Sequence, residues 1–456
     1  MFTKNSFGPF ALWKSLLVPA FLLVSVAPIG ITQPASNPSL AATPPLGWNS
    51  WDSFGSTVRE DEVKANADYM AAHMAAFGWQ YIVVDIAWYR THGHNVRTYD
   101  PESYALDSYG RFVPRLNRFP SAANGNGFKP LADYVHRKGL KFGIHIMRGI
   151  PRKAVADNLP IYGSSSRAPD VADKNNVCKW LADTYGIDMS KPGAQEYYDS
   201  IAALYASWGV DYVKADDMSS PYQAAEIQAL STALRKTGRP IVLSLSPGPA
   251  PVAMVEDLRK WAQLWRISND FWDNWKALKP QFEVTKVWAP FIRAGAWPDA
   301  DMLPLGHFTS QVEVGKERNT NFTKDEQYTL MTLDAIFRSP LMMGGDLPAN
   351  DAFTLSLLTN REVLRVNQHS TGNRPVLVDA QKALWVAETE AKGGYYVAVF
   401  NLGESPETYK YPWKDLGFGA PAYRVRDLWS HRNLGRMAML TVTLPPHGAA
   451  LYQAVP

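Results

Sequence analysis

The sequence predicts an α/β protein in two parts, a (β/α)8 barrel followed by a C-terminal antiparallel β-sandwich. Two sequence patterns, one in each part of the chain, lead to this prediction. From residue 43 to about residue 370, apolar runs rich in β-branched residues alternate with amphipathic stretches. After that point the apolar runs become short and are separated by Gly, Pro, Asn or charged residues. The length of 456 residues also favours one large and one smaller domain, because single cores rarely grow that large.

The alternation defines the elements of the first part. Strands are expected at 46–51, 81–88, 140–147, 211–216, 240–246, 264–270 and 340–346, and helices at 60–77, 131–138, 195–208, 221–237 and 325–337. Near-continuous apolar strands separated by amphipathic helices indicate a parallel sheet that is covered by helices. Seven or eight such units suit a closed TIM barrel better than an open sheet. A doubly wound sheet is the alternative, although no Gly-rich dinucleotide fingerprint follows an early strand.

The second part is expected to be antiparallel. Its short apolar runs lie at 383–387, 394–401, 423–429 and 439–444, and turn residues separate them. It contains no clustered acid, base or nucleophile, so we expect it to brace the barrel. The domain prediction is therefore a barrel at 43–370 and a sandwich at 371–456.

Residues 1–42 are predicted to be a signal peptide. Lys4 and Lys14 precede the apolar stretch 15–27, and small residues around Ala41 offer a cleavage site. An uncleaved membrane anchor is the alternative, although the stretch is short for a span. The chain has a single cysteine and can form no internal disulfide. These features favour a secreted or periplasmic bacterial protein, with no membrane contact once the signal is removed.

The charge balance restricts the class of binding partner. The chain carries 46 basic and 43 acidic side chains, for a net charge of +3, and no long basic run. No electrostatic case for nucleic-acid binding follows from this composition. The partner is expected to be nearly neutral.

Reactive groups in a barrel of this type lie at the carboxyl ends of the strands. The polar and aromatic residues at the predicted strand ends are Trp48, Asn49, Asp85, His145, Lys214, Asp216, Ser246, Arg266, Asp270, Asp299 and Asp301. Acids dominate this set, so a Ca²⁺ or Mg²⁺ site has to be weighed. The acids come singly from different strands and are mixed with Lys214 and Arg266, so no metal is expected.

Two of these acids suit the cleavage of a glycosidic bond. That reaction needs one ionised carboxylate and one carboxylic acid that donates a proton. Asp216 suits the first task, because Lys214 lies two positions earlier on the same strand face. Asp270 suits the second, because its apolar neighbours should raise its pKa, although Arg266 opposes this. An ordinary salt bridge or a helix N-cap is the alternative for either residue.

The tryptophans support the same chemistry. Most of the sixteen are expected to fill the core. Trp48, Trp88 and Trp297 differ, because each lies beside a strand end, where an indole face could pack against the apolar face of a pyranose.

The chain also resembles glycoside hydrolase family 27, which contains α-galactosidases and α-N-acetylgalactosaminidases. The matching segments lie at 43–51, 209–216, 265–268, 297–303, 326–327, 340–341, 345–347, 358–360 and 366–368. The resemblance implies a retaining α-glycosidase without a cofactor, with Asp216 as nucleophile and Asp270 as acid/base. It further implies that Trp48 forms the aromatic floor of the sugar pocket and that Asp85 contacts the O4 side.

The remaining positions carried over from the family are polar. Lys214 and Arg266 fall on donors to ring hydroxyls, and Asp301 lies within the matching segment 297–303. His145 stands where the family usually has Tyr, and it is expected either to contact substrate or to bond a core neighbour. Ser246 stands where α-galactosidases often have Glu, which could leave room for a 2-acetamido group.

One departure bears on the identity of the sugar. Family α-galactosidases carry two successive aspartates at the end of the second strand, whereas here Asp85 is followed by Ile86. The methyl groups of Ile86 cannot replace the hydrogen bonds of a buried sugar hydroxyl, a loss of about 1.5–3 kcal/mol. A β-L-arabinopyranoside has the galactose ring without the hydroxymethyl arm, and the family includes β-L-arabinopyranosidases.

The sequence therefore predicts an α-galactosidase-like retaining exo-glycosidase with a carbohydrate substrate. A β-L-arabinopyranosidase is the first alternative and an α-N-acetylgalactosaminidase the second. A non-catalytic sugar-binding protein is the alternative from another class. The oligomeric state and the aglycone are left open.

Overall fold

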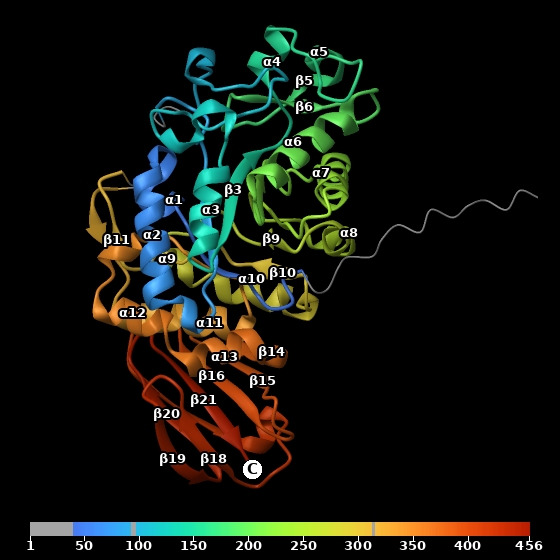
Figure 1. Ribbon diagram of the computed structural model, residues 1–456. Coiled ribbons are helices and arrows are strands. Elements are labelled where there is room, and N and C mark those ends of the chain that lie inside the picture. The colour runs from blue at the N-terminus through green and yellow to red at the C-terminus, as the bar shows by residue number, and fades with distance from the viewer. Residues whose placement is uncertain (1–39, 93–96, 312–314) are drawn as a thin grey trace, which may run out of the picture. The chain divides into compact units, whose positions relative to one another are not determined.

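The computed structural model describes residues 40–92, 97–311 and 315–456 (Figure 1). The predicted signal peptide at 1–42 lies outside the described residues, apart from its last three positions. Within the described part, no helix combines the length and the apolar character that crossing a bilayer requires.

Eight parallel strands form the central sheet. In sheet order they are β10 (Trp297–Asp299), β9 (Leu264–Arg266), β8 (Val242–Leu245), β7 (Tyr212–Asp216), β3 (Lys141–Met147), β2 (Tyr81–Val84), β1 (Leu46–Asn49) and β13 (Leu341–Met343). The two edges of the sheet meet just beyond β10, where the Leu303 N–H donates to the Met342 carbonyl at 2.8 Å. A parallel bridge from Leu303 to Met343 continues that contact. The sheet curls round as a TIM barrel requires, which confirms the predicted fold.

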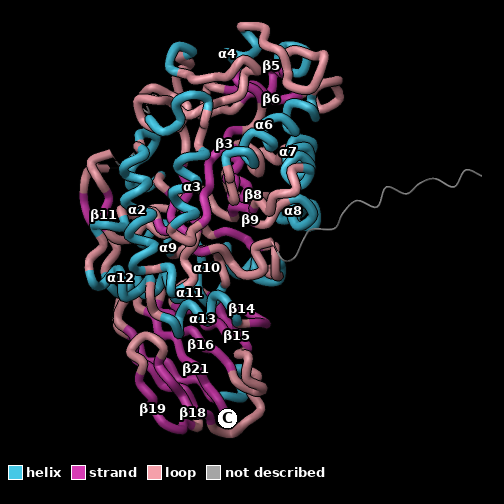
Figure 2. The backbone as a smooth tube through the Cα atoms, viewed as in Figure 1, coloured by secondary structure: helices cyan, strands magenta, loops and turns pink. Residues whose placement is uncertain are grey.

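Helices follow the strands along the chain and cover the outside of the sheet (Figure 2). They are α1 (Trp51–Phe54), α2 (Glu60–His73), α3 (Lys129–Arg137), α6 (Ala194–Trp208), α7 (Ala224–Lys236), α8 (Val255–Trp261), α9 (Trp275–Leu278), α10 (Gln281–Trp288), α11 (Lys324–Phe337), α12 (Ala352–Leu358) and α13 (Arg361–His369). The strands are buried on both faces, since only Lys141 among their residues is exposed. This double burial explains why they read as continuous apolar runs.

The strands are shorter than the sequence predicts, and one was not predicted. Residues 85–88, 267–270 and 344–346 are loops, because the chain leaves the sheet where polar groups begin. At the end of β2, for example, the Asp85 N–H donates to the Ser50 hydroxyl rather than to a neighbouring strand. The strand β10 contains Pro298 in a three-residue run, which is too short to give a periodic signal.

A small antiparallel sheet is inserted between β3 and α6. It consists of β4 (Ile150–Pro151), β6 (Thr184–Ile187) and β5 (Ala172–Val177), with α4 (Arg152–Ala156) and α5 (Ala168–Val171) beside it. Figure 1 shows this insertion above the barrel, beyond the end of β3. Residues 148–188 therefore form an extension at the end of the barrel where the active groups were expected.

The C-terminal part is an antiparallel β-sandwich, which confirms the second half of the predicted fold. One sheet has the order β14 (Thr371–Val378), β15 (Lys382–Glu388), β16 (Tyr395–Asn401), β21 (Ala449–Val455), β18 (Tyr423–Asp427) and β19 (Arg432–Met437). The other pairs β17 (Glu407–Pro412) with β20 (Met439–Leu444). Leu384 and Val399 of the first sheet share one core with Tyr409 and Leu440 of the second.

Candidate active site

A cavity of about 750 Å³ opens at the carboxyl ends of the barrel strands. The predicted site residues that line it are Asp85, Ile86, Lys214, Asp216, Ser246, Arg266, Asp270 and Asp301. Both predicted catalytic aspartates therefore face the same cavity. Another cavity, of about 790 Å³, lies near α6 and contains none of the predicted site residues.

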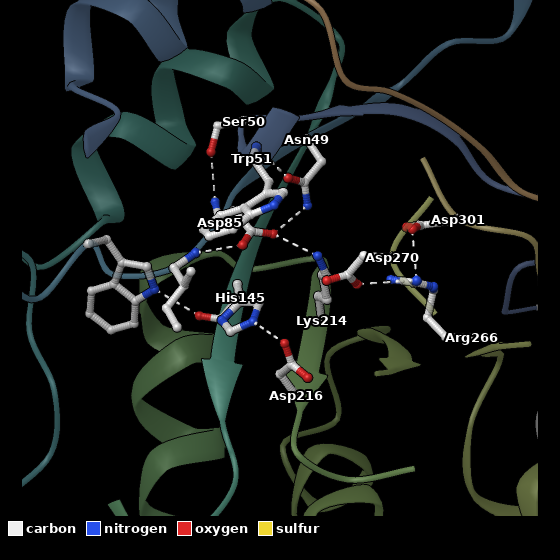
Figure 3. Close-up of polar contacts among 12 residues, drawn as sticks. Asn49, Ser50, Trp51, Asp85, His145, Lys214, Asp216, Arg266, Asp270 and Asp301 are labelled. Carbon is white, nitrogen blue, oxygen red and sulfur yellow. Dashed lines mark hydrogen bonds and ion pairs between the residues drawn. The ribbon is translucent and has the colours of Figure 1, made fainter. Parts of the chain in front are cut away.

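Asp216 lies at the end of β7 and is 9% exposed. His145 Nε2–H donates to its Oδ2 at 3.1 Å (Figure 3). The Asp217 N–H donates to its Oδ1 at 2.8 Å. Burial opposes ionisation of Asp216, but the His145 hydrogen bond and the charges of His145 and Lys214 outweigh it and lower its pKa. Asp216 is therefore an ionised carboxylate across the neutral pH range.

Asp85 and Lys214 form a buried ion pair beside Asp216. Lys214 Nζ donates to Asp85 Oδ2 at 2.9 Å, and Asn49 Nδ2 donates to the same oxygen at 2.8 Å (Figure 3). Burial would raise the pKa of Asp85, but Lys214 and His145 lower it to about 2. Burial likewise opposes the charge of Lys214, whose pKa is nevertheless raised because Asp85 and Asp216 lie near it. The pair presents a charged donor and a charged acceptor to the cavity.

Arg266 links two further acids on the opposite side. Its Nη2 lies 2.7 Å from Asp301 Oδ2 and 3.4 Å from Asp270 Oδ1. Burial raises the pKa of Asp301 to about 6, although Arg266 counteracts this effect. Asp301 Oδ2 also accepts the Phe271 N–H at 2.8 Å, which ties the loop that carries Asp270 to the segment after β10.

Asp270 does not lie in the apolar surroundings that its sequence neighbours predicted, so that prediction is wrong. Its side chain is 75% exposed at the mouth of the cavity. The neighbouring Trp265 and Ile267 are buried in the core and do not cover it. Neighbours in the sequence do not surround Asp270, because the chain leaves the strand after Arg266 and bends at residues 268–269 before it reaches Asp270.

Two other expectations need correction. Trp48 is fully buried and donates its indole N–H to the Gly345 carbonyl at 2.9 Å, so it does not form a sugar floor. Trp51, the second tryptophan of the same motif, lines the cavity instead. His145 is 2% exposed and is absent from the cavity wall; it acts on Asp216, and its hydrogen bond is the neighbour contact that the sequence analysis left open.

Several wall residues were not predicted. They include Trp51, Asp52, Arg97, Trp180, Asn269, Trp272 and Met302. Trp180 comes from the β5–β6 connection, which has no periodic signal, and Asp52 comes from a four-residue helix directly after β1. Only Trp51 and Met302 lie within segments that match family 27, where a finer reading of the motif could have found them.

The described residues contain no group of three or more His, Cys, Asp or Glu side chains arranged to hold a metal ion. The wall instead combines acids, three cations, small hydroxyl residues and indole rings. These groups suit a neutral polyhydroxylated ring. A barrel with two aspartates facing such a cavity at its strand ends belongs to the class of barrel glycosidases.

Comparison with known proteins identifies the family. Residues 181–369 match the model described as Alpha galactosidase A, and residues 379–454 match the one described as Alpha galactosidase C-terminal beta sandwich domain. Alpha-galactosidase 2 of Arabidopsis thaliana is 29% identical over 91% of this chain and 90% of its own length.

Two solved bacterial structures are more similar. A GH27 β-L-arabinopyranosidase of Geobacillus stearothermophilus is 49% identical, with a TM-score of 0.89 over 92% of this chain and 98% of that chain. A putative α-N-acetylgalactosaminidase of Bacillus halodurans is 44% identical, with a TM-score of 0.83 over 92% and 99%. The chain belongs to glycoside hydrolase family 27, and it is a glycoside hydrolase that acts on a carbohydrate substrate.

Proposed function

We propose that this glycoside hydrolase is a retaining β-L-arabinopyranosidase that removes single terminal sugars. One observation carries the proposal. Ile86 lines the cavity directly after Asp85, at the position where α-galactosidases of the family carry a second aspartate, and it is 3% exposed. An apolar side chain there favours a sugar that has no hydroxymethyl group. The similarity to the Geobacillus stearothermophilus β-L-arabinopyranosidase supports the same choice.

The two aspartates would divide the reaction between them. Asp216, whose pKa is lowered despite burial, attacks the anomeric carbon and forms a covalent glycosyl-enzyme. Asp270 donates a proton to the leaving oxygen and then removes one from the water that hydrolyses the intermediate. Its exposed position at the mouth suits both tasks, because the departing group and the incoming water must each reach it.

The other wall residues would hold the sugar. Lys214 and Asp85 offer a donor and an acceptor to neighbouring ring hydroxyls, and Arg266 offers a donor from the far side. Trp51 supplies the apolar surface that the sequence analysis had assigned to Trp48. Ser246 completes the wall near Arg266.

An α-galactosidase is the second candidate function. It is favoured by the curated relatives at 27–29% identity, which carry that name in plants. An α-N-acetylgalactosaminidase would need Ser246 to leave space for an acetamido group, and the Bacillus halodurans neighbour bears that description.

The purified enzyme tests these candidates on p-nitrophenyl β-L-arabinopyranoside, α-D-galactopyranoside and α-N-acetylgalactosaminide. We expect kcat/KM for the arabinoside to exceed that for the galactoside by at least about tenfold, the size of one lost hydrogen bond to a charged group. Asp216→Asn serves as the inactive control. A preference for the galactoside would refute the arabinopyranosidase assignment, and hydrolysis of none would leave only sugar binding.

The role of Ile86 is tested by Ile86→Asp, with Ile86→Val as the matched apolar control. We expect Ile86→Asp to move the ratio of the two kcat/KM values toward the galactoside by at least about tenfold. The valine variant should keep the ratio of the wild type, because it removes one methylene and adds no polar group. Equal ratios in all three proteins would show that Ile86 does not select the sugar.

We also infer that the chain is exported by its N-terminal segment. The apolar stretch after Lys4 and Lys14 and the small residues around Ala41 support this.

A further inference from the structure

Three buried polar atoms in residues that line the cavity have no hydrogen-bond partner. They are Ser246 Oγ, Arg266 Nε and Asp52 Oδ2. An unpaired buried polar group costs about 1–3 kcal/mol, so its persistence needs an explanation such as a ligand that completes it. Ser246 and Arg266 were expected to face the sugar. Asp52 has no place in the mechanism above.

The position of Asp52 is unusual for an acid. It lies in α1, directly after Trp51, and is 3% exposed. Its Oδ2 packs against Gly344, where an added Cβ would come within 1.9 Å of that oxygen. The Gly344 N–H is already donated to the Leu303 carbonyl. This oxygen of Asp52 therefore has no hydrogen-bond donor among the described residues.

The charges around Asp52 disfavour a carboxylate there. Burial is the largest effect and raises the pKa of Asp52 well above its ordinary value. Asp301, Asp85 and Asp273 raise it further, and Lys214 alone among the named charges opposes them. A protonated carboxyl group has an O–H that can donate, which a carboxylate does not.

We propose that Asp52 is a specificity-determining residue whose neutral carboxyl group hydrogen-bonds one ring hydroxyl of the bound pyranoside. The proposal rests on the glycosidase function above and names a further contact in that site. A neutral acid adds a donor to a wall on which Asp85, Asp216 and Asp301 already supply acceptors. The wall can therefore donate a hydrogen bond to the oxygen of a sugar hydroxyl and accept one from the proton of a sugar hydroxyl.

The test compares Asp52→Ala and Asp52→Asn on p-nitrophenyl β-L-arabinopyranoside and on its 2-, 3- and 4-deoxy analogues. We expect Asp52→Ala to lower kcat/KM for the full substrate roughly 10- to 100-fold. Asp52→Asn should recover most of this loss, because an amide is neutral and also donates. For one deoxy analogue, the alanine variant and the wild type should have the same kcat/KM. Asp61→Ala, on the exposed face of α2, is the control and should behave as the wild type.

Three results would overturn the proposal. Unchanged kcat/KM in Asp52→Ala would show that the residue makes no contact with the sugar. An equal loss in Asp52→Asn would show that a charge is required. An equal penalty on all three deoxy analogues would show a purely structural role. Thermal melting and calorimetric titration with L-arabinose separate loss of the fold from loss of binding.

The role of Asp52 can be tested whichever sugar the enzyme prefers. If the wild-type enzyme prefers galactosides, the same cycle is run with deoxy galactosides, and Asp52 is judged on those. If the wild type hydrolyses no glycoside, the proposed function fails. Asp52 is then judged by whether Asp52→Ala weakens binding of L-arabinose or D-galactose while Asp52→Asn retains it.

Discussion

Asp216 owes its ionised state to donors rather than to exposure. The carboxyl group is buried, which by itself would favour the protonated form, and yet its pKa is lowered. His145 contributes the largest opposing effect, through the hydrogen bond from Nε2 to Oδ2. The backbone N–H of Asp217 donates to the other oxygen. His145 is thus a positioning residue that keeps the proposed nucleophile Asp216 charged, and it does not line the cavity.

This role predicts the pH dependence of a His145→Phe variant. A carboxylate nucleophile loses activity as the pH falls through its pKa, so a lowered pKa places the acid limb of kcat/KM below the ordinary value of about 3.9. Removing His145 takes away the hydrogen bond and the charge that lower this pKa. We expect the acid limb to move to higher pH in His145→Phe, measured between pH 3 and pH 7 on the arabinoside.

A second histidine–aspartate pair provides the control. His136 Nε2 lies 2.8 Å from Asp211 Oδ2, and neither residue lines the active-site cavity. His136→Phe should leave the acid limb where it is in the wild type. An acid limb that stays in place in His145→Phe would mean that the hydrogen bond does not govern the ionisation of Asp216.

At the scale of residues, strand-end position and motif pointed to Asp216 and Asp270, the two aspartates proposed to be catalytic, and both line the cavity. The sequence did not predict which side chains near the end of a strand point into the cavity and which point into the core. Trp48 lies within β1 and Trp51 follows it, and only the structure shows that Trp48 is buried and donates to the Gly345 carbonyl. Asp52 was not predicted as a site residue, because its burial depends on Gly344, which lies almost three hundred positions away in the sequence.

At the scale of elements, one buried network ties the loop after β7 to three other segments. Arg148, just past β3, donates to Asp217 Oδ2 at 2.9 Å and 2.7 Å and to Glu226 Oε1 on α7 at 2.7 Å. It also donates to Asn176 of the inserted sheet at 3.0 Å. Asp217, directly after the proposed nucleophile Asp216, has a left-handed backbone conformation with φ of 60°. Arg148 therefore fixes the loop that presents Asp216.

Arg148→Met is expected to destabilise the fold by about 3–5 kcal/mol, because it leaves two buried acids without their cation. The measurement is urea unfolding at neutral pH, with kcat on the arabinoside as a second readout. Arg365→Met is the matched control, because Arg365 and Glu390 form an exposed pair with side chains 59% and 47% exposed. The control should cost less than about 1 kcal/mol. Equal losses in both variants would show that the Arg148 network contributes no more than a surface pair.

The sequence predicted the order of barrel elements because double burial gives each strand a continuous apolar run. It gave no elements for residues 148–188. The strand β5 reads Ala-Asp-Lys-Asn-Asn-Val, and none of its residues is fully buried, so neither an apolar run nor an alternation marks it. This insertion nevertheless supplies Trp180 to the cavity and Asn176 to the Arg148 network.

At the scale of the molecule, the barrel and the sandwich share one apolar core. Trp385 of β15 and Phe400 of β16 are fully buried. Their rings contact Phe337 and Phe282 of the barrel helices, at centroid distances of 6.2 Å and 4.9 Å. The sequence analysis expected the sandwich to brace the barrel, but these contacts join residues too far apart in the chain to be inferred from local patterns.

Polar contacts reinforce this junction around His447. Its ring stacks on Trp275 of α9 at 3.8 Å, and its Nδ1 lies 2.9 Å from Glu326 of α11. Its carbonyl accepts the Thr329 hydroxyl at 2.6 Å. The loop between β20 and β21 is thereby held against two barrel helices, and both helices lie on the outside of the catalytic barrel.

A shared core predicts that the barrel does not fold without the sandwich. Ending the chain at residue 370 would uncover Phe282 and Phe337, and burying such side chains contributes about 1.5–3 kcal/mol each. Two such side chains together contribute about 3–6 kcal/mol, a large fraction of the 5–15 kcal/mol by which a domain is typically stable. We expect the truncated chain to be insoluble or unfolded by circular dichroism. In the full chain we expect one thermal transition, at which activity and near-ultraviolet circular dichroism are lost together. Trp385→Ala should lower that single transition temperature, although Trp385 is not among the residues that line the catalytic cavity. A folded, active truncated barrel, or two separate transitions in the full chain, would contradict the shared core.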